Sequence, residues 1–360
     1  MQSIANINIF ISFTEILTQM KKQGETTIHD IARKLNIAAS TVSRALNNNP
    51  IISEPTRKLI EKTAKEMGYR PNTLAASFRT KRTNMIGVVL PLINRHFFSS
   101  VISGIEEVAY SSGFAVTISQ TNDNFEKEEK IIQTLFSNRV DGLIVSIGMQ
   151  TQTFNHLKLF SDKKIPLVFF DRVVEEIDAD KIVVDDYRGG FIATEHLIEH
   201  GATKIAHIGG PLNVKIYKDR LSGYKDAMNK AGLPIDENML IHNSLTREDG
   251  TNAIKKLLLN EEKPDAIFCA NDTTALSVII YLREHGIKVP DNISIVGFSN
   301  EPFSELVTPS ISTIRQPGFE MGKKAAELLI NHIKQKEQHT SSQTIVMPTE
   351  LIVRESSGRD

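Results

Sequence analysis

Hydrophobic residues recur every three or four positions in the first part of the chain, and this spacing predicts short amphipathic helices. Thr26 or Thr27 is suited to cap the first helix, and Asn36 is suited to a left-handed corner after it. A third helix is expected from the N-cap Ser53 to Met67. The apolar stripes of the first two helices are Ile28, Ile31, Ala32 and Leu35, then Val42, Ala45 and Leu46.

The pattern changes from Asn84 onward, where short runs rich in Val, Ile and Phe alternate with helix-compatible segments. Alternating β and α elements predict parallel sheets covered on both faces, so the fold class is α/β. Two successive series of strands predict two lobes with a cleft, and small ligands bind beyond the carboxyl ends of such strands. The runs are MIGVVLPL, FAVTISQT, VDGLIVSI, PLVFFDR, KIVVDD, KIAHIGG, AIFCAND and ISIVGFS.

The outward face of the second helix is short, polar and carries one long cation. Its residues are Ala39, Ser40, Thr41, Ser43 and Arg44. A helix that enters a DNA major groove needs small residues for close approach, hydroxyls for phosphates and a guanidinium for guanine. The alternative is an ordinary helical hairpin with a solvated face.

Charge is unevenly distributed along the 360 residues, although the net charge is only −1. Residues 27–82 contain eleven Lys or Arg and four Asp or Glu, whereas the remainder contains 31 and 39. A basic head on an acidic body is typical of a nucleic-acid reader joined to a domain with another task. The coincidence of the basic cluster with the helical pattern argues against random scatter.

Composition narrows the class of protein. A content of 40% hydrophobic and 24% charged residues is that of a globular protein, and no apolar run reaches the length of a membrane span. The one cysteine, Cys269, excludes an intrachain disulfide and fits a reducing cytoplasm. We expect no metal and no cofactor.

The motifs TVSRALN, ISEPTRKLIEKTAKEMGYRPN and LAASF follow one another in a specific order and spacing. They resemble the DNA-binding headpiece and hinge helix of the lac repressor/galactose repressor (LacI/GalR) family, and the resemblance continues to about residue 355. It implies a helix-turn-helix headpiece and a two-lobed body like that of periplasmic binding proteins. The implied divisions are a headpiece at 26–72, a hinge helix at 73–83 and a body at 84–355, with lobe 1 at about 84–184 and 313–341 and lobe 2 at about 185–312 and 342–355. The chain is expected to cross between the lobes near 184, 312 and 342.

Residues 1–25 form an extension whose first 19 residues do not fit the family pattern. They lack the basic start and clean apolar centre of a signal peptide. We hypothesise that translation begins at Met20 or that the segment is a disordered arm.

The resemblance assigns DNA contacts residue by residue. Ala39, Ser40 and Arg44 are implied to face the bases. Thr41, Ser43 and Asn47 are expected to contact phosphates, which position the protein without specifying sequence. Phe78 stands where relatives place a minor-groove leucine wedge, with packing against the body as its alternative. Arg79 and Arg82, with Lys81, are expected to hold flanking phosphates or to be solvated.

One headpiece position departs from the family pattern. Many relatives have Ser as the N-cap of the recognition helix, where this chain has Ala38. Alanine is a weak cap, so we expect a cost of about 1 kcal/mol in local stability.

Candidate effector contacts lie where strands end. Arg220 matches the arginine that grips the effector in many relatives, and guanidinium and carboxylate groups can each bind a sugar hydroxyl. Two alternatives are open: Asp272 as a helix cap, and Arg172 paired internally with Asp171. Ser299 replaces an aspartate common in relatives, so the site loses a charge. The full set is Phe97, Phe98, Asp171, Arg172, Asp185, Arg220, Asn271, Asp272 and Ser299.

The sequence therefore indicates a transcriptional regulator, expected to be a repressor. The implied partners are double-stranded operator DNA, a second copy of the chain in a homodimer, and a small carbohydrate effector. A transport solute-binding protein does not explain the DNA-binding head, and we find no catalytic constellation for an enzyme. A regulator controlled by a phosphoprotein corepressor remains a rival. The His196–His200 stretch matches an H-x-x-E-H zinc motif, but its apolar neighbours favour a structural helix.

Overall fold

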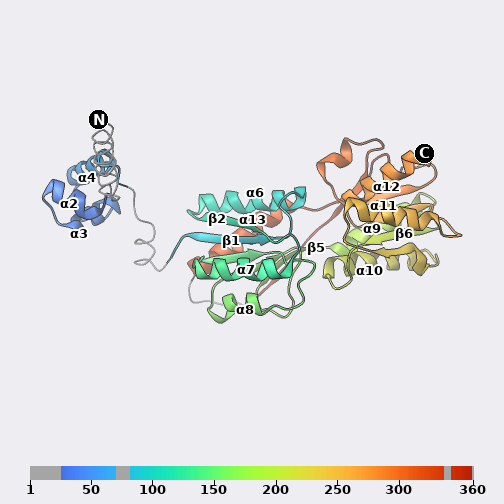
Figure 1. The fold of residues 1–360 in the computed structure, drawn as a ribbon, viewed down its shortest axis with the longest axis horizontal. Helices are drawn as coiled ribbons and strands as arrows, with labels where there is room; N and C mark the ends of the chain where they lie inside the picture. Colours follow the sequence, from blue (N-terminus) through green and yellow to red (C-terminus); the bar gives the residue numbers. More distant parts are fainter. Residues whose placement is uncertain (1–25, 70–81, 336–341, 359–360) are drawn as a thin grey trace, which may run out of the picture. The chain divides into compact units, whose positions relative to one another are not determined.

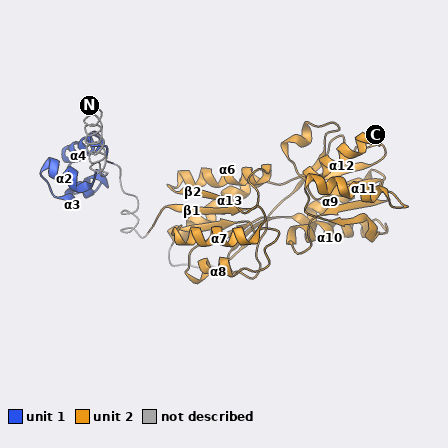
Figure 2. Cartoon of the chain, in the orientation of Figure 1, with its two compact units in different colours: residues 1–81 blue, residues 82–360 orange. Residues whose placement is uncertain are grey.

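The computed structural model describes residues 26–69, 82–335 and 342–358. The chain forms two compact units, residues 1–81 and 82–360, which are coloured separately in Figure 2. The N-terminal extension, residues 73–81 of the expected hinge helix and the predicted contacts Phe78 and Arg79 lie outside the described residues.

The headpiece contains the three predicted helices. They are α2 (Ile28–Leu35), α3 (Ala39–Leu46) and α4 (Glu54–Glu66). Asn36 has a φ of 52° at the corner between the first two, as its position in the sequence predicts. Ile31, Val42, Ala45 and Ile60 are completely buried against one another, so the apolar stripes of all three helices meet in one small core.

The start of α3 lacks a side-chain cap, because Ala38 is its N-cap residue. We predict that Ala38→Ser will stabilise the headpiece by about 1 kcal/mol, since a serine hydroxyl can accept an unpaired N–H of the first turn. Thermal unfolding followed by the helical signal of the headpiece measures this change. An unchanged or lower stability would show that the Ala38 backbone does not present a capping geometry.

Lobe 1 is a six-stranded sheet between two pairs of helices (Figure 1). The strand order is β11-β5-β4-β3-β1-β2 and every pairing is parallel. Helices α6 and α13 cover one face, and α7 and α8 cover the other. The elements are β1 (Met85–Leu90), α6 (His96–Ser111), β2 (Ala115–Gln120), α7 (Phe125–Ser137), β3 (Gly142–Val145), α8 (Asn155–Asp162), β4 (Leu167–Phe170), β5 (Asp180–Val184), α13 (Gly318–Lys334) and β11 (Thr344–Met347).

Lobe 2 repeats this plan with the strand order β12-β10-β9-β8-β6-β7, in which only β12 is antiparallel. Helices α9 and α10 pack on one face, and α11 and α12 on the other. The elements are α9 (Asp186–Glu199), β6 (Ile205–Gly209), α10 (Lys215–Lys230), η1 (Glu237–Met239), β7 (Leu240–His242), α11 (Arg247–Leu258), β8 (Ala266–Cys269), α12 (Asp272–Glu284), β9 (Ser294–Ser299), η2 (Pro302–Glu305), β10 (Ser312–Arg315) and β12 (Glu350–Ile352). The α/β fold class is confirmed.

The chain crosses between the lobes three times, but two crossings lie later than the sequence positions suggest. The first follows β5 directly, near the expected residue 184. The second follows β10, because residues 312–315 still pair with β9 in lobe 2. The third follows β11, because residues 344–347 pair with β5 in lobe 1. Two strands in different sheets, β11 in lobe 1 and β12 in lobe 2, are therefore separated around Pro348, whereas the sequence assigns all of 342–355 to lobe 2.

Helices α9 and α10 approach closely enough that glycine is required where they cross. A Cβ on Gly190 would lie 2.2 Å from the Arg220 carbonyl oxygen, and a Cβ on Gly223 would lie 2.1 Å from that of Tyr187. This close approach fixes the position of Arg220 on α10 relative to α9.

We predict that Gly190→Ala will destabilise the body by about 1–3 kcal/mol, because the added methyl group forces the two helices apart. Urea unfolding of the full chain measures the change. Ser222→Ala, on the exposed side of α10, is the matched control and should change stability by less than about 0.5 kcal/mol. Equal effects of the two substitutions would contradict the close-packing argument.

Candidate functional site

The predicted DNA-facing residues of α3 occupy its exposed side. Ser40, Arg44 and Asn47 are exposed, whereas Ala39, Thr41 and Ser43 are half-buried. The Asn47 side-chain amide donates to the Ser43 carbonyl oxygen at 2.6 Å, which extends the end of the helix. Arg44 projects its guanidinium from the last turn, so α3 presents a small, hydroxyl-bearing surface beside one cation.

Arg82 makes a contact that neither sequence alternative included. Its guanidinium donates a hydrogen bond to the carbonyl oxygen of Ile333, in the last turn of α13. Terminal carbonyls of a helix lack helical partners and favour a cation. Arg82 therefore attaches the start of the body to lobe 1, and its expected phosphate contact stays a prediction.

A cavity of about 400 Å³ lies between the two lobes, at the carboxyl ends of both sheets. Eight of the nine predicted effector residues line it: Phe97, Phe98, Asp171, Arg172, Arg220, Asn271, Asp272 and Ser299. Asp185 does not belong to this lining. Its carboxylate instead caps α9 by accepting the Arg188 N–H at 2.8 Å.

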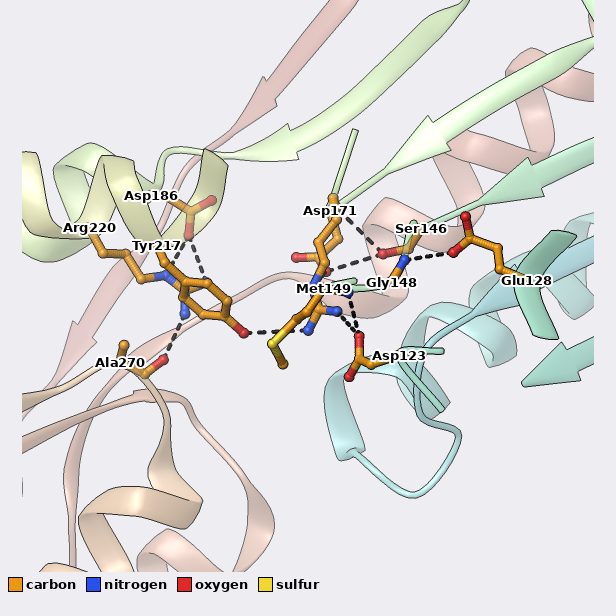
Figure 3. Close-up of polar contacts among 11 residues, drawn as sticks. Asp123, Glu128, Ser146, Gly148, Met149, Asp171, Asp186, Tyr217, Arg220 and Ala270 are labelled. Atoms are coloured by element: carbon orange, nitrogen blue, oxygen red, sulfur yellow. Dashed lines mark hydrogen bonds and ion pairs between the residues drawn. The ribbon is translucent and has the colours of Figure 1, made fainter. Parts of the chain in front are cut away.

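Arg220 is held in place by lobe 2 before any ligand is considered (Figure 3). Its Nε and Nη2 atoms both lie 2.7 Å from Oδ1 of Asp186, and Nη1 donates to the Ala270 carbonyl oxygen at 2.7 Å. The guanidinium also lies 3.6 Å from the centre of the Phe298 ring. Burial disfavours the charged form of the Asp186 carboxyl and raises the pKa of this group to about 7. Arg220 thus reaches the cavity with a fixed orientation.

Arg172 connects the two lobes. Its Nη1 donates to Oδ1 of Asp123 at 2.5 Å, and its Nη2 lies 3.4 Å from the Tyr217 hydroxyl in lobe 2. The Asp171 carboxylate is only a distant partner, with 3.9 Å between the charged atoms. The internal pairing expected between Asp171 and Arg172 is therefore secondary to the pair with Asp123.

Asp171 is the cavity carboxylate with the weakest internal partners among the described residues. Ser146 lies 3.4 Å away and the Arg172 Nε lies 3.9 Å away. The backbone of Asp171 is left-handed, with a φ of 57°, and its side chain is buried. Burial raises the pKa of this carboxyl. Strained residues of this kind are retained where the surroundings or a function require them.

The start of α12 corrects one alternative from the sequence. Asn271, not Asp272, is the N-cap, and its side-chain oxygen accepts the Thr274 N–H at 2.8 Å. Both oxygens of Asp272 are engaged elsewhere: the Thr313 hydroxyl donates at 2.6 Å and the Glu301 backbone N–H at 2.7 Å. Burial raises the pKa of Asp272 to about 6. This carboxylate supports the cavity wall by joining three segments of lobe 2.

Two aromatic rings of lobe 1 supply part of the apolar lining of the cavity, which also includes Leu92, Met149, Pro211, Ile216 and Leu245. Phe97 and Phe98 follow His96 in the first turn of α6 and pack edge to face with their centroids 5.2 Å apart. Both also belong to the core of lobe 1, so their positions are fixed by packing. The site therefore combines rigid apolar surface from lobe 1 with oriented polar groups from both lobes.

Comparison with known proteins decides which family has this architecture. A family model of the bacterial regulatory proteins of the lacI family matches residues 27–72, and one of the periplasmic binding protein-like domain matches residues 194–357. The HTH-type transcriptional regulator DegA of Bacillus subtilis is 37% identical over 334 residues, which span 92% of this chain and 98% of DegA. The chain belongs to the lacI family.

Further relatives of this lacI-family protein agree. The HTH-type transcriptional repressor PurR of Vibrio atlanticus is 35% identical over 86% of this chain and 93% of its own. The structure of a CelR–cellobiose complex is 27% identical with a TM-score of 0.71, covering 92% of this chain and all of that one. A LacI regulator from Alkaliphilus metalliredigens complexed with D-xylulofuranose is 31% identical with a TM-score of 0.67, covering 77% of this chain and all of that one.

Family membership makes the protein a DNA-binding transcriptional regulator rather than an enzyme. It confirms the family resemblance that the headpiece motifs indicate. Within the described residues, none of the helices combines the length and hydrophobicity needed to cross a bilayer.

Several cavity residues of this lacI-family protein were not predicted from the sequence. Asp123, Arg95 and Glu301 line the cavity although none ends a predicted strand within the quoted motifs. Tyr217 was visible as an aromatic three residues before Arg220, on the same helix face, and that spacing was a usable signal. The others depend on how loops of different lobes meet, which no local pattern encodes.

The H-x-x-E-H stretch occupies the end of α9. The Nε2 atom of His196 lies 2.7 Å from the Ser357 hydroxyl, and Nδ1 of His200 lies 2.8 Å from the His196 carbonyl oxygen. Burial lowers the pKa of His196 to about 4, which keeps that ring neutral near pH 7. The His196 contact joins α9 to the C-terminal segment of the lacI-family body, and the His200 contact stays within the end of α9.

Proposed function

We propose that this lacI-family regulator binds a sugar or sugar derivative in the interlobe cavity, and that this ligand controls its affinity for operator DNA. The carrying observation is the cavity between two lobes that both supply oriented polar groups. A hydroxyl-rich ligand suits this lining, because hydroxyls both donate and accept hydrogen bonds while the ring faces pack on Phe97 and Phe98. The loss of a carboxylate at Ser299 leaves the particular sugar open.

The relatives support a carbohydrate ligand. The CelR structure is a complex with cellobiose, and the Alkaliphilus regulator is a complex with D-xylulofuranose. From these two complexes we infer for this protein only the class of ligand, a carbohydrate, and neither of the two compounds. The proposed contacts are Arg220, Arg172 and Asp171, with Asn271 and Asp272 acting through the wall that they support.

On the DNA side we propose a homodimer bound to a pseudo-palindromic, double-stranded operator. A two-fold protein matches a two-fold site, with one α3 helix in each half-site. Arg44 is the proposed guanine contact, and Phe78 is the proposed minor-groove wedge. The sugar changes operator affinity only if it binds the two conformations of the body with different affinity.

A thermal-shift screen of the purified protein against sugars, sugar acids, sugar phosphates and nucleosides tests the effector. A ligand at about 100 times its dissociation constant adds about 2.7 kcal/mol of stability. We expect a neutral or substituted sugar to raise the melting temperature and to change binding to operator DNA selected from a random pool. If the panel is blank while operator binding is intact, a phosphoprotein corepressor becomes the better explanation.

A further inference from the structure

One rim of the cavity is closed by contacts between the lobes that involve the start of α6. The His96 backbone N–H, at the first residue of the helix, points at the Glu301 carboxylate of lobe 2. Its nitrogen lies 3.2 Å from one carboxylate oxygen and 3.3 Å from the other. An unpaired N–H at a helix start, reinforced by the helix dipole, favours a negative charge at that position.

A second contact crosses between the lobes beside the first. The Arg95 guanidinium, one residue before α6, donates a hydrogen bond to the Thr273 hydroxyl at the start of α12. Arg95 and Glu301 both line the cavity. Lobe 1 therefore presents a cation and a helix start at this rim, and lobe 2 presents a carboxylate and a hydroxyl.

The loop that carries Glu301 is held rigidly by lobe 2. Its own backbone N–H donates to Asp272 at 2.7 Å, and the preceding Asn300 accepts from the Arg354 guanidinium at 2.9 Å. Ser299 and Asn300 have φ values of 113° and 51°, so two consecutive residues are left-handed. Such a backbone persists only when its surroundings over-determine it. Glu301 is thus aimed at α6 by fixed structure rather than by a flexible side chain alone.

We infer that Glu301 is a clamp that holds the two lobes closed at this rim by supplying the anion that the start of α6 favours. The closed cleft is then stabilised by the protein's own residues. A ligand therefore need not provide the contact that closes the lobes at this rim. An anionic group of a ligand would find this position already occupied by the Glu301 carboxylate. The consequence for ligand affinity rests on the proposed function, whereas the closure itself does not.

The clamp is tested in the full chain by measuring the distance between the lobes. Spin labels at Ser103→Cys on α6 of lobe 1 and at Glu284→Cys, the last residue of α12 in lobe 2, report the separation of the two lobes. Both sites are exposed, and the native Cys269 is buried. The labelled chain is diluted with unlabelled chain, so that distances within one chain dominate the pulsed electron double-resonance measurement.

We expect Glu301→Ala to shift the distance distribution toward longer separations, and Glu301→Gln to shift it less, because the amide oxygen still accepts a hydrogen bond. Glu305→Gln is the matched control, since it removes the same charge from an exposed residue of η2 whose nearest cation, Arg354, is 3.9 Å away. Its distribution should equal that of the parent.

Two results would overturn the clamp: an unchanged distribution for both Glu301 variants, or an equal shift for Glu305→Gln. Melting temperatures measured on the same samples distinguish opening from unfolding, and Glu301→Gln serves if the alanine variant does not fold. A blank sugar screen combined with a shifted distribution would reject the proposed effector while leaving the clamp intact.

Discussion

Replacing Arg220 with Gln is expected to abolish the response to sugar and to destabilise the body by about 3–5 kcal/mol. The substitution leaves Asp186 buried, at 3% exposure, without its cationic partner. Breaking a buried ion pair on one side carries a cost of this size, because the remaining carboxyl must be protonated or hold an uncompensated charge in a low-dielectric site. Urea unfolding measures the stability, and the sugar-induced shift in melting temperature measures binding.

The double variant Arg220→Gln with Asp186→Asn separates the two effects. Two neutral amides can hydrogen-bond where the ion pair stood, so most of the lost stability should return. The sugar response should not return, because the guanidinium that faces the cavity is still absent. A double variant that binds sugar like the parent would show that Arg220 is structural and not a ligand contact.

Arg44→Ala is expected to reduce discrimination at one base pair of the operator by about 1–3 kcal/mol, or about 5- to 150-fold in affinity ratio. The reason is that a guanidinium on the exposed face of α3 can bond two acceptors of guanine in the major groove. Fluorescence anisotropy with the selected operator and with single-base variants measures the ratio.

Arg33→Ala is the matched control for Arg44. Arg33 lies on α2, is 80% exposed in its side chain and binds Asp30 at 3.2 Å, so its loss removes the same charge without touching α3. We expect it to weaken specific and scrambled DNA alike, with a small effect on each. If Arg44→Ala also weakens both DNAs equally, or weakens neither, the assignment of Arg44 to a base contact is wrong.

The fold was largely predictable because its elements are locally encoded. The stripe through Ile31 and Val42, the corner at Asn36 and the Val/Ile-rich strands each follow from short-range periodicity. The crossings after β10 and β11 were misplaced because strands of both sheets are apolar and short. Pro348 was the overlooked signal, since proline rarely continues a strand.

The site was predictable only where a residue ends a parallel strand or matches a family motif. Asp171, Asn271 and Ser299 lie at the cavity for the first reason. Asp185 satisfied the same pattern, but its side chain caps α9 instead. Glu301 was not predictable, because its importance arises from its contact with His96 in the other lobe, some two hundred residues earlier.

Calorimetric titration of the sugar identified in the screen into the protein, alone and saturated with operator DNA, tests whether the interlobe cavity controls DNA binding. Linkage requires that, if the sugar changes operator affinity by some factor, operator changes sugar affinity by the same factor. We predict two different sugar dissociation constants whose ratio equals the change in operator affinity measured independently. Equal dissociation constants with and without operator would contradict control of DNA binding through the interlobe cavity.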